Sequence, residues 1–203
     1  MAGRVWQAGE GPASPWAVPN IITVVRILFA PALAWALLAD AGQGGPLRWI
    51  AFALFVVGIS SDAVDGHLAR SRNLITDFGK LLDPIADKAL TGVALVVLAV
   101  LGELPWWVTG LILLREIGIT VWRLVEARRI VLPAGRGGKA KTLAQAVAIS
   151  FALAPFPALV GEWMHWVNAA LMSIAFILTL WSGADYLVRA YASPNQVVPS
   201  GRG

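Results

Sequence analysis

Residues 62–87 read DAVDGHLARSRNLITDFGKLLDPIAD, and long apolar stretches flank this segment on both sides. Its polar and small residues follow the spacing D-x2-D-G-x2-A-R-x8-G-x3-D-x3-D, filled by Asp62, Asp65, Gly66, Ala69, Arg70, Gly79, Asp83 and Asp87. Carboxylates inside membrane-embedded helices are costly unless they are paired, solvated or bound to cations. The segment therefore predicts a functional site in a membrane protein, with a divalent metal as the simplest cation.

The composition supports the membrane assignment. Of 203 residues, 58% are hydrophobic and only 14% are charged, with a mean hydropathy of +0.70. Such a chain is too apolar for a soluble domain of this size. Apolar stretches close to the length of a membrane span occur at Ile21 to Leu38, Leu47 to Leu68, Leu81 to Leu101, Trp106 to Val125, Leu143 to Val160 and Trp166 to Val188. We expect an all-α integral membrane protein, a bundle of six transmembrane helices.

The bundle should form one domain, residues 20–192. Residues 1–19 lack the basic start and uninterrupted apolar core of a cleaved signal peptide, so they are expected to be an interfacial or flexible leader. Residues 193–203 are polar and contain Pro and Gly, which predicts a disordered tail.

Charge and cysteine content narrow the partners. The net charge is +4 with no cysteine, so metal ligands have to be oxygens, and disulfide chemistry is excluded. Because the basic residues lie at predicted loops and helix ends, we expect anionic membrane lipids and anionic substrates as partners, and no nucleic acid.

The basic residues also predict orientation. Those expected on one side are Arg4, Arg70, Arg72, Lys80, Lys88, Arg123, Arg128, Arg129, Arg136, Lys139, Lys141, Arg189 and Arg202, whereas the opposite loops hold almost none. By the positive-inside rule, both termini and the aspartate cluster face the cytoplasm of a multi-pass protein in the cell inner (plasma) membrane.

The aspartates are predicted to converge. Asp62 and Asp65 share a helical stripe with Gly66 and Ala69, and Asp83 and Asp87 share one with Gly79. The short turn from Ser71 to Phe78 makes the two helices antiparallel neighbours.

Four neighbouring negative charges need compensation, and two Mg²⁺ (or Mn²⁺) ions prefer oxygen ligands. Such a metal pair can assist an in-line displacement at phosphorus. Gly66, Ala69 and Gly79 would let a nucleotide lie against helix backbone, and Arg70 can hold a diphosphate. The structural alternative is that the aspartates pair with Arg70, Lys80 and Lys88 and only hold the two helices together.

The eight-residue pattern resembles the signature of the CDP-alcohol phosphotransferase family, and every signature position is filled. The resemblance covers residues 20–188. It implies that Asp62, Asp65 and Asp83 bind metal, and that Asp87 binds metal and also acts as general base. Asn20 and Thr23, which share a face of the first predicted helix with Arg26, would join Gly66, Ala69, Arg70 and Gly79 in binding the CDP group.

Further segments are similar to the branch of this family that uses CDP-diacylglycerol as donor and glycerol 3-phosphate as acceptor. They are Asn20–Thr23, Thr76–Lys88, Leu104–Trp107, Arg115–Gly118 and Gly138–Thr142. The resemblance implies a sequential displacement that releases CMP, and a homodimer. Branches that use phosphatidylglycerol or inositol phosphate share the metal motif and remain alternatives.

A phosphorylated acceptor needs its own cations. The candidates are Arg115, Arg136, Lys139 and Lys141. For the last three, plain topological charge is the competing explanation, and Arg115 can instead pair with Glu116 or Asp185.

Asp185 and Arg189, four residues apart, predict an ion pair on a helix surface. His67 and His165 are not expected to be ligands. A cation transporter is the competing class of protein, but it would place carboxylates near the middle of the membrane.

Overall fold

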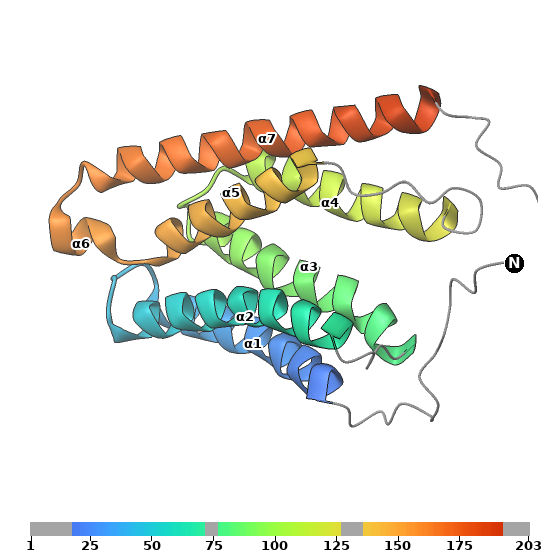
Figure 1. Ribbon diagram of the computed structural model, residues 1–203. Coiled ribbons are helices and arrows are strands. Elements are labelled where there is room, and N and C mark those ends of the chain that lie inside the picture. The colour runs from blue at the N-terminus through green and yellow to red at the C-terminus, as the bar shows by residue number, and fades with distance from the viewer. Residues whose placement is uncertain (1–17, 72–76, 127–135, 193–203) are drawn as a thin grey trace, which may run out of the picture. The chain divides into compact units, whose positions relative to one another are not determined.

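The computed structural model describes residues 18–71, 77–126 and 136–192, which form helices joined by short turns (Figure 1). The helices are α1 (Val18–Asp40), α2 (Pro46–Ser71), α3 (Asp77–Val100), α4 (Trp106–Glu126), α5 (Arg136–Leu153), α6 (Phe156–Val160) and α7 (Met164–Ala192). Side chains are described over the same ranges except at residues 18–20, 62–71, 77–84, 87, 123–126, 136–137 and 190–192. No strand occurs in the described residues, which confirms the all-α prediction.

Two of the described helices are long and apolar enough to cross a membrane, over Ile21–Asp40 and Met164–Arg189. Pro46–Ser61 and Lys88–Val100 are shorter apolar segments. The bundle of six membrane spans stays a prediction.

The chain divides into two compact units, Met1–Val97 and Leu98–Gly203. In the first unit, α1 packs along α2. Its buried core includes Leu33, Leu37, Phe55, Leu90 and Leu95. Burying such side chains stabilises a unit in water, but in a membrane close packing has to supply the association.

The turn between α1 and α2 is organised by Asp40, which is buried at the end of α1. Its Oδ2 accepts a hydrogen bond from Gly44 N at 3.0 Å, and its Oδ1 accepts one from Gly45 N at 2.7 Å. Gly42 and Gly44 have positive φ angles of 76° and 70°, a conformation that glycine adopts without steric cost. Both carboxylate oxygens of Asp40 therefore serve the turn.

In the second unit, α5 and α4 both pack against α7, and the short α6 also contacts it. Figure 1 shows α5 running beside α7. Ile112, Ile149 and Leu153 are fully buried in this unit. The same interior holds several polar side chains, which belong to the candidate site.

The predicted fifth span, Leu143 to Val160, has the wrong limits. Its helix α5 begins seven residues earlier, at Arg136, and ends at Leu153. Pro155 has no N–H to continue the helical hydrogen bonds, so the chain turns and restarts as the five-residue α6, with Pro157 in its first turn. Arg136, Lys139 and Lys141 consequently lie on a helix rather than in a loop.

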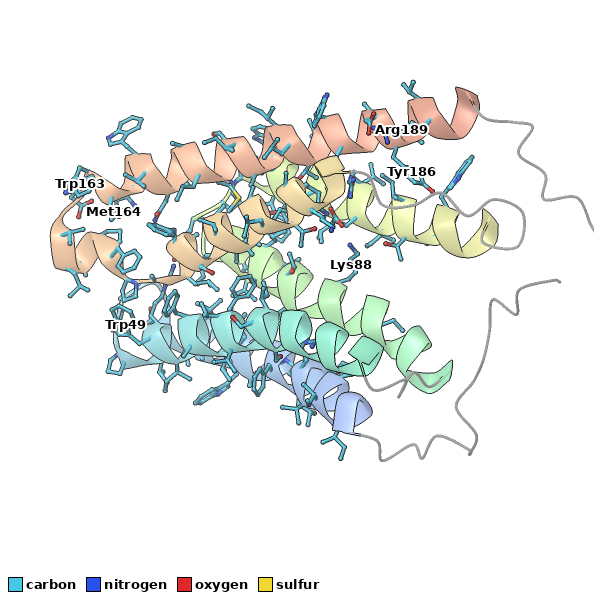
Figure 2. All side chains as sticks on the ribbon, in the orientation of Figure 1. Trp49, Lys88, Trp163, Met164, Tyr186 and Arg189 are labelled. Carbon is cyan, nitrogen blue, oxygen red and sulfur yellow. The ribbon has the colours of Figure 1, made fainter. Side chains whose placement is uncertain are left out.

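Tryptophan side chains are exposed near the helix ends. Figure 2 shows Trp49 in the first turn of α2 and Trp163 just before α7. Both are exposed, as are Trp106, Trp107 and Trp166. Exposed amphipathic rings at helix ends suit a position among lipid headgroups.

Candidate functional site

The motif positions lie on two consecutive helices of the first unit. Asp62, Asp65, Gly66, Ala69 and Arg70 belong to α2, and Gly79, Asp83 and Asp87 belong to α3. Their side chains lie outside the described residues. Among the side chains that are described, no three His, Cys, Asp or Glu come together as a metal site. The aspartate metal site therefore stays a prediction.

A described contact shows which faces of α2 and α3 meet. A Cβ atom at Gly58 would lie 2.5 Å from Leu90 Cδ2 and 3.4 Å from Phe29 Cδ2. The α2 backbone is thus packed closely against side chains of both α3 and α1. Only a residue without a side chain fits at position 58 without displacing a neighbour.

The close contact is in register with the motif. Positions 62 and 65 follow Gly58 by four and seven residues on α2, and positions 87 and 83 precede Leu90 by three and seven residues on α3. These spacings return to the same helical stripe. Five residues, 72–76, separate the ends of the two helices. By helical periodicity the motif positions share stripes with Gly58 and Leu90, and the convergence of the aspartates stays a prediction.

The α1 helix adds buried polar residues to the same unit. Thr23 and Arg26 are 3% and 2% exposed, which agrees with the predicted polar face of this helix. The side chain of Asn20, the third member of that face, lies outside the described residues. Sequence reasoning placed Arg26 on this face but assigned it no role.

The second unit contains a buried ionic cluster from two helices. Arg115 Nη1 lies 3.0 Å from Glu116 Oε1, and Lys141 Nζ donates to the same oxygen. The exposed fractions of these side chains are 15% for Arg115 and 6% for both Glu116 and Lys141. Two cations share one carboxylate, and these three side chains together carry a formal charge of +1.

Residues of α7 hold Arg115 from the other side. Arg115 Nη2 donates to Ser182 Oγ at 2.9 Å, and Ser182 Oγ itself donates to the Thr179 carbonyl at 3.1 Å. The arginine stem runs over Gly183, where a Cβ atom would lie 3.1 Å from Arg115 Cγ and 3.3 Å from its Nε. The guanidinium is therefore restrained by α4 and α7 together.

A second polar contact joins α5 to α7 one turn away. Gln145 Nε2 donates to Thr179 Oγ1 at 2.8 Å, and Thr179 Oγ1 donates to the Ala175 carbonyl at 2.6 Å. Both side chains are buried. Polar residues inside apolar helices are a sequence signal for such interhelical bonds, but Gln145, Thr179 and Ser182 were not identified from the sequence.

The remaining predictions can be compared with the described side chains. Arg115 pairs with Glu116 and not with Asp185, whereas Asp185 forms the predicted ion pair with Arg189 at 2.9 Å. Figure 2 shows Arg189 on the C-terminal part of α7.

Two other basic side chains are exposed: Lys139 on α5 and His165 in the first turn of α7. His165 Nε2 lies 3.2 Å from Glu162 Oε2. The side chains of Arg136 and His67 lie outside the described residues.

Comparisons with known proteins agree on one family. The sequence model described as CDP-alcohol phosphatidyltransferase matches residues 16–181. A Mycobacterium tuberculosis protein named "Probable phosphatidylglycerophosphate synthase" is 46% identical over 171 residues, covering 84% of this chain and 80% of the relative.

Two more distant bacterial relatives carry the name "CDP-diacylglycerol--glycerol-3-phosphate 3-phosphatidyltransferase". The Bacillus subtilis protein is 36% identical over 84% of this chain and 89% of its own length. The Escherichia coli K12 protein is 34% identical over 86% of this chain and 95% of its own length.

Proposed function

The chain belongs to the CDP-alcohol phosphatidyltransferase family, and on that premise we propose that it transfers a phosphatidyl group from CDP-diacylglycerol to sn-glycerol 3-phosphate. The products are CMP and phosphatidylglycerophosphate. The observation that carries this proposal is the similarity to relatives with that named activity, which extends over at least 84% of this chain. The complete eight-residue motif supports the same chemistry.

The motif fits a pair of divalent cations. Asp62, Asp65, Asp83 and Asp87 supply only carboxylate oxygens, the ligands that Mg²⁺ or Mn²⁺ prefers. The Gly58–Leu90 contact, in register with these positions, supports their convergence. When bound, two such cations would offset the carboxylate charges and stabilise negative charge on phosphate oxygens during a displacement at phosphorus.

Asp87 has a second proposed role as general base. It accepts the proton of the acceptor hydroxyl while that oxygen attacks the phosphorus that bears the diacylglycerol group. The bond from this phosphorus to the CMP oxygen breaks in the same displacement, and no covalent enzyme intermediate forms. A positioned base of this kind contributes roughly 10²–10⁴-fold to a rate.

The donor and acceptor are assigned to different residues. We assign the CDP group to Asn20, Thr23, Gly66, Ala69, Arg70 and Gly79. Small residues allow the nucleotide to approach helix backbone, and an arginine suits a diphosphate. We assign the acceptor phosphate to Arg115, Arg136, Lys139 and Lys141. The net positive charge of the Arg115–Glu116–Lys141 cluster supports this assignment.

The apolar helices, together with relatives named for membrane-lipid synthesis, indicate that the protein is membrane-associated. We further propose a multi-pass protein of the inner membrane whose active site faces the cytoplasm, where soluble glycerol 3-phosphate would reach it. A homodimer is proposed from the family resemblance.

The test is CMP release by the purified protein in detergent with CDP-diacylglycerol and Mg²⁺. Glycerol 3-phosphate, inositol phosphate and phosphatidylglycerol are compared as acceptors. We expect release with glycerol 3-phosphate, and a loss of at least about 100-fold in Asp87→Asn because the base is removed. Asp185→Asn is the matched control, since among the described side chains Asp185 pairs with Arg189 on the surface of α7.

Each other outcome has a distinct meaning. Release with a different acceptor would keep the metal chemistry and overturn the substrate. No release with any acceptor from folded protein would overturn the proposed activity. Cation flux through vesicles without CMP release would favour a transporter.

A further inference from the structure

Glu116 is the one carboxylate of the buried cluster in the described part of the second unit. Its Oε1 accepts from Nη1 of Arg115, the preceding residue of α4, and from Lys141 Nζ on α5. The residue as a whole is 5% exposed. A buried carboxylate that contacts two cations limits how far apart they can lie, because both cations are tied to one oxygen atom.

Stability alone is a weak explanation for this arrangement. Buried ion pairs lose much of their attraction to desolvation, and apolar residues of similar volume often replace them without loss of stability. The Arg115 guanidinium is also held by more contacts than are needed to neutralise its charge. Ser182 fixes Nη2 of the same guanidinium, and the Ser182 proton is committed to the Thr179 carbonyl.

We propose that Glu116 is a positioning residue for the acceptor: it holds Arg115 and Lys141 in the arrangement that receives the phosphate of glycerol 3-phosphate. This inference rests on the proposed function and adds a residue that does not itself touch substrate. Glu116 reduces the charge of the cluster but prevents the two cations from separating. Ser182 assists by fixing the plane of the guanidinium.

Two substitutions of Glu116 distinguish the effect of where the carboxylate lies from the effect of its negative charge. Glu116→Asp keeps the negative charge but withdraws the carboxylate by one methylene group, so it can no longer hold both cations. Glu116→Gln keeps the length but removes the charge, which raises the net charge of the cluster by one. If Glu116 merely weakened the attraction for phosphate, Glu116→Gln would lower the KM for glycerol 3-phosphate, and Glu116→Asp would leave it unchanged.

The measurement is steady-state CMP release, with each substrate varied in turn. Because misplacement of a substrate-binding group by about 1 Å can cost about 100-fold, we expect both variants to raise the KM for glycerol 3-phosphate by about tenfold or more. The KM for CDP-diacylglycerol should stay unchanged. Glu162→Asp is the matched control, because the Glu162 side chain is 91% exposed in the turn before α7.

Ser182→Ala is a second test of the proposal, and it applies if the variants at position 116 do not fold. It frees the guanidinium plane and should raise the KM for glycerol 3-phosphate, whereas Ser173→Ala, which changes an exposed serine of the same helix, should not. The folded fraction is measured for each variant by size-exclusion chromatography.

Normal KM values in folded Glu116→Asp would overturn the positioning role, as would an equal rise in the KM of both substrates. If Glu116→Asp does not fold, a normal acceptor KM in Ser182→Ala would do the same. Failure of the proposed function looks different, because the unaltered protein would then release no CMP with glycerol 3-phosphate.

Discussion

At the residue scale, the closest packing described in the first unit depends on the missing side chain of Gly58. Leu90, which a Cβ atom there would meet, is 1% exposed and has little room to move. Ser61 also donates to the Gly58 carbonyl at 2.8 Å, one turn from the first motif aspartate. A change at this position should therefore affect both stability and activity.

We expect Gly58→Val to destabilise the protein by about 1–3 kcal/mol, the usual cost of overpacking a filled interior. CMP release should fall as well, because α2 and α3 separate next to the aspartate stripes. The measurements are thermal unfolding in detergent and CMP release at saturating substrates. Gly110→Val is the matched control, since a Cβ atom at Gly110 would meet nothing within 4 Å.

A second substitution checks the cause. Leu90→Ala removes the side chain that the valine would strike, so it should recover part of the stability lost in Gly58→Val. If the double variant is instead destabilised by the sum of the two single changes, the contact between positions 58 and 90 does not limit the packing of these helices.

At the element scale, α5 and α7 are joined by the buried Gln145–Thr179 hydrogen bond, and the two partners are not equivalent. Thr179 still donates to the Ala175 carbonyl when Gln145 is removed. Gln145, in contrast, loses the acceptor of its amide when Thr179 is replaced. Leaving a buried donor without a partner costs more than removing the donor.

We therefore expect Thr179→Val to lower the free energy of unfolding by about 1–3 kcal/mol and Gln145→Leu to lower it less. The double variant should be no less stable than Thr179→Val alone, because no polar group is then stranded. Chemical unfolding in detergent measures all three. Thr142→Val, at an exposed threonine of α5, serves as control, and equal losses in both single variants would contradict the asymmetry.

The positions of the helices could be predicted from the sequence where the signal lies within the helix itself. Apolar stretches located the long helices, and the spacing of the motif placed its eight residues on two of them. The expected fifth span, Leu143 to Val160, runs through Pro155, although a proline inside a helix predicts a break at that point. The start of α5 was missed because Arg136, Lys139 and Lys141 resemble loop charges, although lysine and arginine are good helix formers.

The ionic cluster was only partly predictable, for a physical reason. Arg115 and Glu116 are adjacent in sequence, so their pairing was one of two options considered. Lys141 is 25 residues from Glu116, and Ser182 is 67 residues from Arg115. Helical periodicity gives the face on which a residue lies but not the helix that this face meets, so these contacts needed the structure.

At the scale of the whole molecule, the number of membrane crossings decides which segments share a compartment with soluble substrate. Six spans would place residues 127–142 on the cytoplasmic side with the aspartate motif. If only α1 and α7 crossed, every residue between them would lie on one side of the membrane. The position of α5 relative to the membrane therefore distinguishes the two topologies.

The chain contains no cysteine, so single cysteines can be introduced without removing others. Gln43→Cys, Glu103→Cys and Glu162→Cys change exposed residues in the turns before α2, α4 and α7, and Lys139→Cys changes an exposed residue of α5. With six spans and cytoplasmic termini, a membrane-impermeant maleimide should label the three turn positions in intact cells. Lys139→Cys should be labelled only after the cells are permeabilised.

Each of the other two labelling patterns would indicate a different membrane topology. Labelling of all four positions in intact cells would show that only α1 and α7 cross, since residues 41–163 would then share the outer side. Labelling of Lys139→Cys alone would show the reverse orientation and contradict the positive-inside assignment. In either case the cationic end of α5 would lie on the outer side, away from cytoplasmic glycerol 3-phosphate. The assignment of Arg136, Lys139 and Lys141 to the acceptor phosphate would then be wrong, whatever activity the purified protein showed in detergent.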